Sequence, residues 1–243
     1  MLGFGRRSFA RRARAQVRAP FIATNLKGCV VWLTAARGLL AADIAGNAIS
    51  TWADQSGQGN TPTQATGANK PTYSAAGGPN GRPVVTFSGN QWLALGSAPV
   101  SANNFTLIAV FKITGASQLM FSVGDGSTGV AVGTLSSRAV NCNGVATDSD
   151  GAFTSNYEVW TVTSSSAPLQ ALRVNGAAQS LSPNTTTTIA ASAHFVIGAQ
   201  TTVPNFPVTG GLAEAAFYNR VLGTAEILEA EAALATQYGI YKA

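Results

Sequence analysis

One stretch near the C-terminus decides the fold: Gly210-Gly211-Leu212-Ala213-Glu214-Ala215-Ala216-Phe217-Tyr218-Asn219-Arg220-Val221-Leu222-Gly223-Thr224-Ala225-Glu226-Ile227. Its first part predicts a strand, because side chains alternate between the two sides of a strand and both sides are mostly apolar here. One side is predicted to carry Leu212, Glu214, Ala216 and Tyr218. A strand that is apolar on both sides is typical of the centre of a sheet that is covered on both faces.

The residues after this strand predict a helix that packs on the sheet. Apolar residues recur at helical spacing, namely Ile227, Ala230, Leu234 and Tyr238. Thr224 is the expected N-cap, with Glu226 in the first turn, where a carboxylate favours the positive end of the helix. Gly239 follows the last periodic residue and is the expected C-cap.

Several blocks of the sequence resemble a known family. Gly-Leu-Ala-Glu at residues 211–214, Tyr-Asn-Arg at 218–220 and Gln-Tyr-Gly-Ile at 237–240 resemble the closing strand and helix of concanavalin A-like, laminin-G-type jelly-roll domains. The blocks 31–36, 52–60 and 81–87 agree, so the resemblance covers residues 28–240. It implies an all-β fold, a two-sheet antiparallel β-sandwich. Such domains are widespread in surface-binding proteins and common in bacteriophage virion proteins.

Length and composition agree with one all-β domain. Only 10% of the 243 residues are charged, and 26 are glycine, which is typical of a turn-rich β protein. We expect a basic arm at residues 1–27, a sandwich at 28–243 and a short C-terminal helix. The expected strands are 28–34, 83–87, 91–95, 105–113, 119–123, 130–134, 137–142, 157–163, 169–174 and 195–198. No apolar run reaches about 18 residues, so no membrane span or membrane partner is predicted.

Turn signals place some of the connections. Strands 83–87 and 91–95 are expected to pair across residues 88–90, and Asn175-Gly176 predicts a hairpin. Residues 35–80 read as a long ordered loop region, in which Trp52 packs against the sandwich. Asp54 is expected to make turn hydrogen bonds there, and a ligand role for it is the alternative.

The positive charge is concentrated in the arm. Residues 1–20 contain no acid and six arginines, Arg6, Arg7, Arg11, Arg12, Arg14 and Arg18. The rest has 15 − 6 = 9 Lys or Arg against 10 Asp or Glu, a net charge of −1. We interpret the arm as an anchor whose arginines pair with acidic groups or phosphates of a larger assembly, while Phe4 and Phe9 enter apolar notches.

Other interpretations of the arm stay open. No apolar segment follows the arginines, so neither a Sec nor a twin-arginine export signal is predicted. An organellar transit peptide fits the composition, and a solvated tail is the plainest alternative. Nucleic-acid contact through phosphates is a further alternative, though not the favoured one.

Catalytic motifs are missing from the sequence. There is no Gly-x-Ser-x-Gly elbow, and the Glu-x-Asp-x-Glu strand of concanavalin-type glycosidases is absent. His194, the single histidine, is expected at a strand end in a structural role. Glu226, Glu229 and Glu231 are interpreted as a solvated helix face. The sequence therefore predicts a protein that is not an enzyme.

A ligand-binding rim is the remaining candidate site. Asp148 and Asp150 follow Asn143 closely, and carboxylate and amide oxygens are the ligands that Ca²⁺ prefers. Calcium on Asp148 and Asp150 is thus the one metal considered, and ordinary turns are the alternative; no other cofactor is predicted. The candidate rim residues are Trp92, Asp125, Asn143, Asp148, Asp150 and Tyr157. Phe153 is a further aromatic that could stack on a sugar ring, although core packing is the default for such rings.

The two cysteines do not indicate a metal or redox site. Cys29 and Cys142 lack CxxC spacing and a histidine partner. Two buried free thiols are the expectation, and one disulfide is the alternative.

Two classes of function follow. The resemblance and the arm together imply a non-enzymatic virion structural protein, a capsid-decoration or tail adsorption module. It would be assembled in the host cytoplasm in many copies, bound to other virion proteins through its arm, with a host-surface glycan as a further partner. The alternative is a stand-alone carbohydrate-binding lectin or a degenerate glycoside hydrolase.

Overall fold

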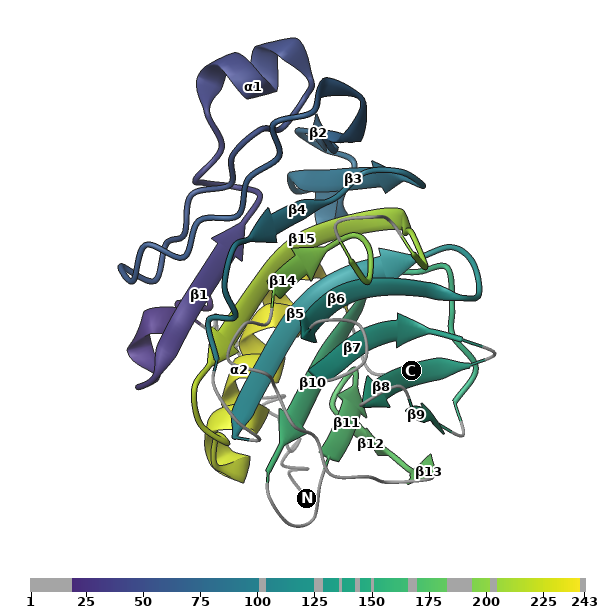
Figure 1. Ribbon diagram of the computed structural model, residues 1–243. Coiled ribbons are helices and arrows are strands. Elements are labelled where there is room, and N and C mark those ends of the chain that lie inside the picture. The colour runs from purple at the N-terminus through teal and green to yellow at the C-terminus, as the bar shows by residue number, and fades with distance from the viewer. Residues whose placement is uncertain are drawn as a thin grey trace, which may run out of the picture.

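Two antiparallel sheets face each other, and a helix covers the outer side of the larger one (Figure 1). The computed structural model describes residues 19–100, 104–124, 129–135, 137–142, 145–149, 151–165, 170–182, 194–201 and 205–240. This architecture confirms the all-β two-sheet sandwich with a short C-terminal helix. The six arginines of the arm and its residues Phe4 and Phe9 lie outside the described residues, whereas Phe21 and Ala23, at the end of the predicted arm, are buried in one cluster with residues of the C-terminal helix.

The larger sheet is built around the stretch quoted first, which forms strand β15. In the described chain it has eight strands, in the order β12 (Ala177–Gln179), β11 (Gln170–Val174), β10 (Glu158–Ser164), β5 (Phe105–Ile113), β15 (Thr209–Tyr218), β3 (Val84–Ser88) and β2 (Thr72–Ser74), with β1 (Cys29–Thr34) also paired to β15. Strand β15 pairs with β5 along one edge, and with β3 and then β1 along the other. It is therefore a central strand, as its apolar sides predicted.

The smaller sheet corrects one predicted pairing. Its seven described strands run in the order β13 (Leu181–Ser182), β9 (Val145–Ser149), β8 (Arg138–Cys142), β7 (Gly129–Thr134), β6 (Gln118–Gly124), β14 (His194–Ile197) and β4 (Leu93–Leu95). The predicted hairpin of residues 83–87 with 91–95 is wrong, because β3 and β4 lie in different sheets. Gly89, with a φ of 109°, helps the chain turn across the sandwich instead of folding back.

A β-bulge in β15 changes which side chains share a face. Against β5, Leu212 pairs with Phe111 but Glu214 pairs with Val110, so Ala213 is an extra residue. Leu212 consequently faces the other sheet, whereas Glu214 faces the helix. The predicted common face for Leu212 and Glu214 is therefore wrong.

Two hydrophobic cores fill the molecule. The larger lies between the sheets and contains Trp52, which is fully buried as predicted, and an aromatic group around Phe217. The Phe217 ring meets Phe121 and Phe195 edge-on, with centroid distances of 5.7 and 4.9 Å. The smaller core lies between the outer face of the larger sheet and helix α2 (Thr224–Tyr238).

Helix α2 agrees with its predicted pattern, apart from two residues. Its four periodic apolar residues are buried, and Gly239 ends it with a φ of 65°. The N-cap is Gly223 and not Thr224, because the Glu226 carboxylate accepts the Gly223 N–H at 2.8 Å. Glu231 is not solvated: it is buried and pairs with Arg173 of β11 at 2.9 Å.

Residues 35–80 form an ordered extension that includes one helix the sequence did not predict, α1 (Ala41–Gly46). It also contains the short 3-10 helix η2 (Gly67–Asn69) and ends at a second one, η3 (Pro79–Gly81). A third 3-10 helix, η1 (Ala23–Asn25), lies before β1. The turn role predicted for Asp54 is confirmed, since its carboxylate accepts N–H groups of Ser56 at 2.8 Å and Asn60 at 3.0 Å. It also accepts the Trp32 N–H at 2.8 Å, which ties this loop to β1.

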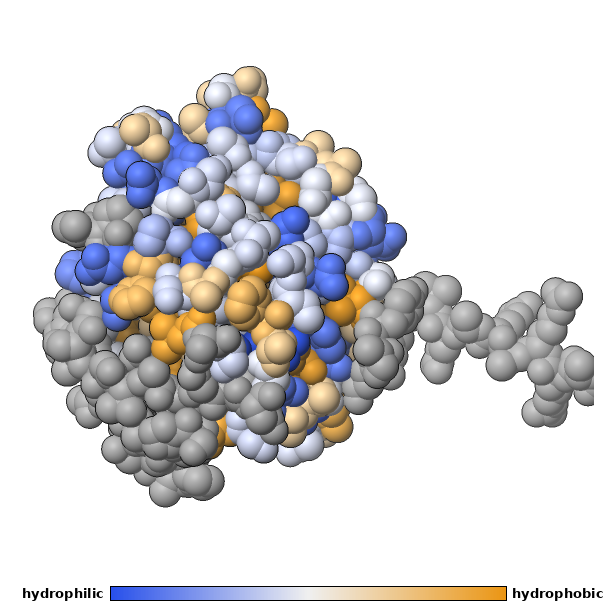
Figure 2. All heavy atoms as spheres, turned by 90° about the vertical axis from the view of Figure 1, so that its right-hand side faces the viewer, coloured by the Kyte–Doolittle hydropathy of each residue, from blue (hydrophilic) through white to orange (hydrophobic). Residues whose placement is uncertain are grey.

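The surface is mixed in character. Figure 2 shows hydrophilic and apolar residues interspersed on the side that it faces. Among the described helices, none is long and apolar enough to cross a membrane.

Candidate functional site

One group of aromatic and polar side chains lies where the loop 151–157 meets the end of β5. Lys112, Phe153 and Asn156 line a small cavity there. The Lys112 ammonium lies 5.0 Å from the ring centroid of Tyr157, which is a cation–π distance. We call Lys112, Phe153, Asn156 and Tyr157 the rim cluster; the first three line the cavity, and Tyr157 is joined to them through Lys112. It combines half-exposed rings with free polar groups, which is chemistry suited to a sugar.

Tyr157 is held with its hydroxyl against the backbone of the sheet. A Cβ on Gly211 would lie on the Tyr157 hydroxyl oxygen, so this close approach requires a glycine there. The hydroxyl is buried and has no hydrogen-bond partner in the described part of the protein. Burial raises the pKa of Tyr157 to about 12, so the phenol is neutral at physiological pH. A buried hydroxyl without a partner costs stability, so this ring position is not explained by packing alone.

A buried ion pair between the two sheets is bonded to the loop 151–157. Arg138 of β8 contacts Glu158 of β10 at 2.6 Å, which joins the two sheets. The same carboxylate accepts Trp160 Nε1–H at 2.9 Å and the Thr154 hydroxyl at 3.0 Å. Because Thr154 belongs to the loop, these bonds fix the loop that carries Phe153 and Tyr157.

The other predicted aromatic, Trp92, lies at a different edge. It precedes β4 of the smaller sheet, where its N–H donates to Asn69 O at 3.0 Å and Gln64 Nε2–H donates to its carbonyl at 3.2 Å. Its indole N–H is also buried without a described partner. No described contact joins Trp92 to Tyr157, so the two aromatics are not brought into one site by these residues.

The predicted acidic rim is mostly outside the described residues. Asp125, Asn143 and Asp150 lie there, as do the anchoring residues of the arm. Asp148 is in strand β9, where its backbone pairs with Ala139 and Ser182, and not in a turn. No group of three or more His, Cys, Asp or Glu in the described chain is arranged to hold a metal. Calcium at Asp148 and Asp150 stays a prediction.

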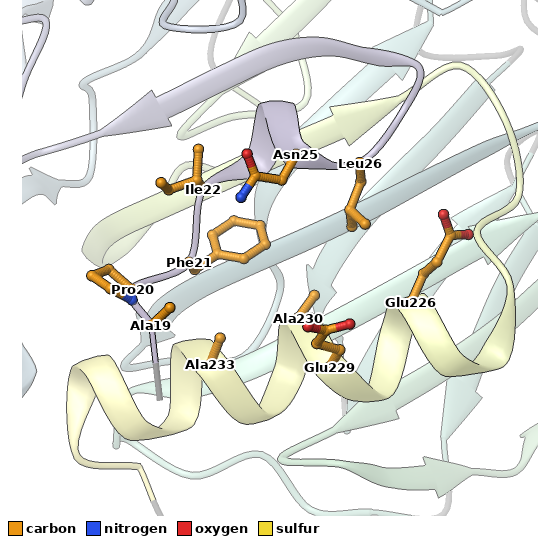
Figure 3. A pocket seen from close by; sticks show the side chains of 10 residues that line it. All are labelled: Ala19, Pro20, Phe21, Ile22, Asn25, Leu26, Glu226, Glu229, Ala230 and Ala233. Carbon is orange, nitrogen blue, oxygen red and sulfur yellow. The ribbon is translucent and has the colours of Figure 1, made fainter. Parts of the chain in front are cut away.

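A larger pocket, which the sequence did not indicate, lies between residues 19–26 and helix α2 (Figure 3). Its volume is about 170 Å³. The lining is apolar at Phe21 and Ala230, and two carboxylates, Glu226 and Glu229, stand along the helix side. Glu226 is already bound to Arg220 at 2.6 Å, and this hydrogen bond lowers the pKa of Glu226 to about 2.

A buried carboxylate at Glu214 was also missed. It accepts hydrogen bonds from Trp32 Nε1 at 2.8 Å, Tyr238 Oη at 2.7 Å and Gln237 Nε2 at 2.9 Å. Burial raises the pKa of Glu214 above its usual value of 4.5. A single glutamate inside an apolar strand was the available signal, and its donors could not be identified from spacing.

The remaining titratable candidates have structural positions. His194 begins β14 at the surface, which is the strand end predicted for it. Cys29 is a free, half-buried thiol, and burial raises its pKa to about 12, so it is a poor nucleophile. The Cys142 side chain lies outside what the structure describes.

Comparison with known proteins connects this fold to carbohydrate-active enzymes. No family model and no curated protein matches the sequence. Domain 4 of AbnA, a GH43 extracellular arabinanase from Geobacillus stearothermophilus in complex with arabinotriose, matches with a TM-score of 0.55 at 14% identity, over 84% of this chain and 98% of that one. An arabinofuranosidase complexed with arabinofuranosyl-alpha-1,2-xylobiose matches with a TM-score of 0.58 at 14% identity, over 87% of this chain and 59% of that one. Trypanosoma rangeli sialidase matches with a TM-score of 0.52 at 14% identity, over 85% of this chain and 33% of that one.

These comparisons correct one prediction. The prediction that the protein is not an enzyme is wrong, because this fold also occurs in arabinanase, arabinofuranosidase and sialidase chains. Missing motifs from one glycosidase family do not exclude activity in a fold that several families share. At this level of identity the likeness shows the shared β-sandwich fold. The three neighbours give no support to a virion role, which stays a prediction.

Proposed function

We propose that this chain is a carbohydrate-binding β-sandwich that holds a short oligosaccharide at the rim cluster. The observation that carries the proposal is the Tyr157 ring, whose hydroxyl occupies the space that Gly211 leaves free and which has the Lys112 ammonium beside it. The fold supports the proposal, because it is shared with domains of carbohydrate-active enzymes.

The rim cluster offers the two kinds of contact that a sugar needs. Phe153 and Tyr157 are half-buried, so part of each ring can cover the apolar C–H face of a sugar. The Lys112 ammonium donates hydrogen bonds, and the Asn156 amide both donates and accepts them, which suits hydroxyl groups. Neither side chain forms an ion pair or a side-chain hydrogen bond in the described chain, so both are available to a ligand.

The first ligands to test are pentose oligosaccharides. Arabinotriose is bound by AbnA domain 4, of which this chain spans nearly the full length. Isothermal titration with arabinotriose and xylobiose should show saturable binding. Asn156→Ala should weaken it about tenfold, a loss of about 1.4 kcal/mol, because the exposed amide contributes to binding and not to packing. Tyr157→Phe should bind as the wild type does, because the hydroxyl is buried.

Trp92→Ala is the matched control, since it removes an aromatic at the other edge. Loss of binding in Trp92→Ala but not in Asn156→Ala would move the site to the β4 edge. Absence of binding across a panel of neutral and acidic glycans would refute the proposal.

We further propose that the arginine-rich part of the arm, residues 1–18, anchors this domain to a larger assembly, with a virion as the first candidate. The distribution of charge along the chain supports this proposal, since residues 1–20 have a net charge of +6 and the rest of the chain has a net charge of −1. Salt-dependent co-sedimentation with the assembly is the test, because exposed ion pairs are screened within about 8–10 Å at ordinary ionic strength.

A further inference from the structure

Helix α1 presents an apolar surface that nothing in the described chain covers. Leu40 and Ile44 are 49% and 39% exposed, and none of the residues of α1 is buried. Leu40 is the N-cap of α1 and Ile44 lies in its first turn, where the Ile44 N–H donates to the Leu40 carbonyl at 3.0 Å, so the two residues are neighbours at the start of the helix. Figure 1 shows α1 as an outlying element, next to β2 at the edge of the larger sheet. We call residues 40–46 the α1 tip.

The α1 tip is held firmly although it is exposed. The Asp43 carboxylate accepts hydrogen bonds from the Ser50 N–H at 2.7 Å and the Thr51 N–H at 3.1 Å. Asn47 ends the helix with a φ of 49° and accepts the Tyr73 N–H at 2.8 Å. The only charged side chain of the tip is therefore used internally, and its outward surface is apolar. A contiguous apolar surface on a fixed element is typical of an interaction site.

The pocket of Figure 3 has the complementary shape and chemistry. It is lined by apolar side chains that include Ile22, Leu26 and Ala233, and Ile22 is 40% exposed. We call it the α2 groove. Its volume of about 170 Å³ suits aliphatic side chains, since an apolar cavity of about 150 Å³ holds a benzene molecule.

The tip and the groove cannot meet within one molecule. Residues 19–26 precede β1 and the α1 tip follows it, so they lie at opposite ends of this strand (Figure 1). Six residues of strand separate them by about 20 Å. We propose that the α1 tip of one copy enters the α2 groove of a second copy. Because the two surfaces are different, the contact is head-to-tail and can continue from copy to copy.

Charge supports a second copy as the occupant. Lys70 is close enough to the tip for its charge to act on Asp43, whereas the exposed Arg37 has its guanidinium 5.5 Å from the centroid of the Trp32 ring. Neither cation forms an ion pair in the described residues. Glu229, beside the groove, has no described ion-pair partner either. The tip therefore has one cation beside it, Lys70, and the groove has one carboxylate beside its apolar lining, Glu229.

Sedimentation velocity of the full chain over a concentration series tests this. The contact is small, so the series should extend to about 1 mM, where weak association is measurable. The wild type should shift from monomer to larger species. Leu40→Glu should stay monomeric because its tip is charged, and Ile22→Glu should stay monomeric because its groove is charged. Both positions are exposed, so folding should be unaffected.

Mixing the two variants gives the decisive result. Each retains one intact surface, so an equal mixture should form a dimer and nothing larger. Leu228→Glu is the matched control, because Leu228 is 47% exposed on the same helix but does not line the groove. A wild type that is monomeric throughout would overturn the proposal. So would association that both variants retain, which would place the contact elsewhere, or a mixture that stays monomeric.

Discussion

Replacing Glu214 with leucine should destabilise the protein more than its position in one strand suggests. The carboxylate is 1% exposed and accepts three hydrogen bonds that join β1, β15 and α2. Glu214→Leu fills the same space but leaves these donors without an acceptor. The change therefore tests whether the network around Glu214 holds the helix on the sheet.

The magnitude follows from how buried each donor is. Trp32 and Tyr238 are 6% and 2% exposed, so their donors cannot reach water easily. Each buried donor without a partner costs about 1–3 kcal/mol. Gln237 is only partly buried and can turn toward solvent, so it adds little. The leucine relieves some of the cost of burying a carboxylate. We expect a net loss of about 2–5 kcal/mol in the free energy of unfolding.

Urea denaturation at pH 7 measures this loss. A second variant, Glu214→Leu with Tyr238→Phe, removes one donor together with the acceptor and should recover about 1–3 kcal/mol. Glu229→Gln is the control, because it changes an exposed glutamate and should stay within about 0.5 kcal/mol of the wild type. If the Glu214→Leu variant has a free energy of unfolding within about 1 kcal/mol of the wild type, the reasoning is refuted. A double variant no more stable than the single one would show that the Tyr238 hydroxyl is not the source of the cost.

Three further predictions concern the helix and the arm. Leu234→Ala should cost about 2–5 kcal/mol in denaturant melts, because Leu234 is fully buried between α2 and the larger sheet; a loss below about 0.5 kcal/mol would contradict this packing. Arg220 lowers the pKa of Glu226 from 4.5 to about 2, so this stabilisation is present above pH 4.5 and is lost as the pH falls toward 2. Glu226→Gln should thus be less stable than the wild type at pH 7 and equally stable near pH 2, and a difference independent of pH would argue against the ion pair. Deleting residues 1–18 should shift the thermal midpoint by less than about 4 °C while abolishing attachment to a larger assembly; a larger shift would place the arm in the sandwich.

The elements with strong periodicity were predictable from the sequence. Helix α2 has apolar residues at helical spacing and a C-terminal glycine, and β5 is a long β-branched and aromatic run. Both follow from local rules that act within one segment. The pairing of β3 with β4 failed because nearness in sequence does not tell a hairpin from a crossing between sheets.

The site was predictable only in part, because its neighbours come from distant segments. Tyr157 could be named from the sequence as an aromatic near a loop. Its contacts with Lys112 and Gly211 depend on the order of strands in the sheet. The bulge at Ala213 depends on pairing with β5, and no spacing within β15 indicates it. Features that arise from strand order therefore remain hidden in a single sequence.

The two buried glutamates of the larger sheet cannot form a catalytic pair, because they lie on opposite faces of it. Glu158 pairs with Phe111, which faces the core between the sheets, and Glu214 pairs with Val110, which faces α2. Residues paired across strands share a face, so these carboxylates lie on opposite faces of one sheet. A pair that cleaves a glycosidic bond must flank that bond from two sides, with the carboxyl groups about 5–9.5 Å apart. Glu158 and Glu214 cannot do this together, since the sheet lies between them. These two glutamates are therefore not a pair that could cleave a glycosidic bond.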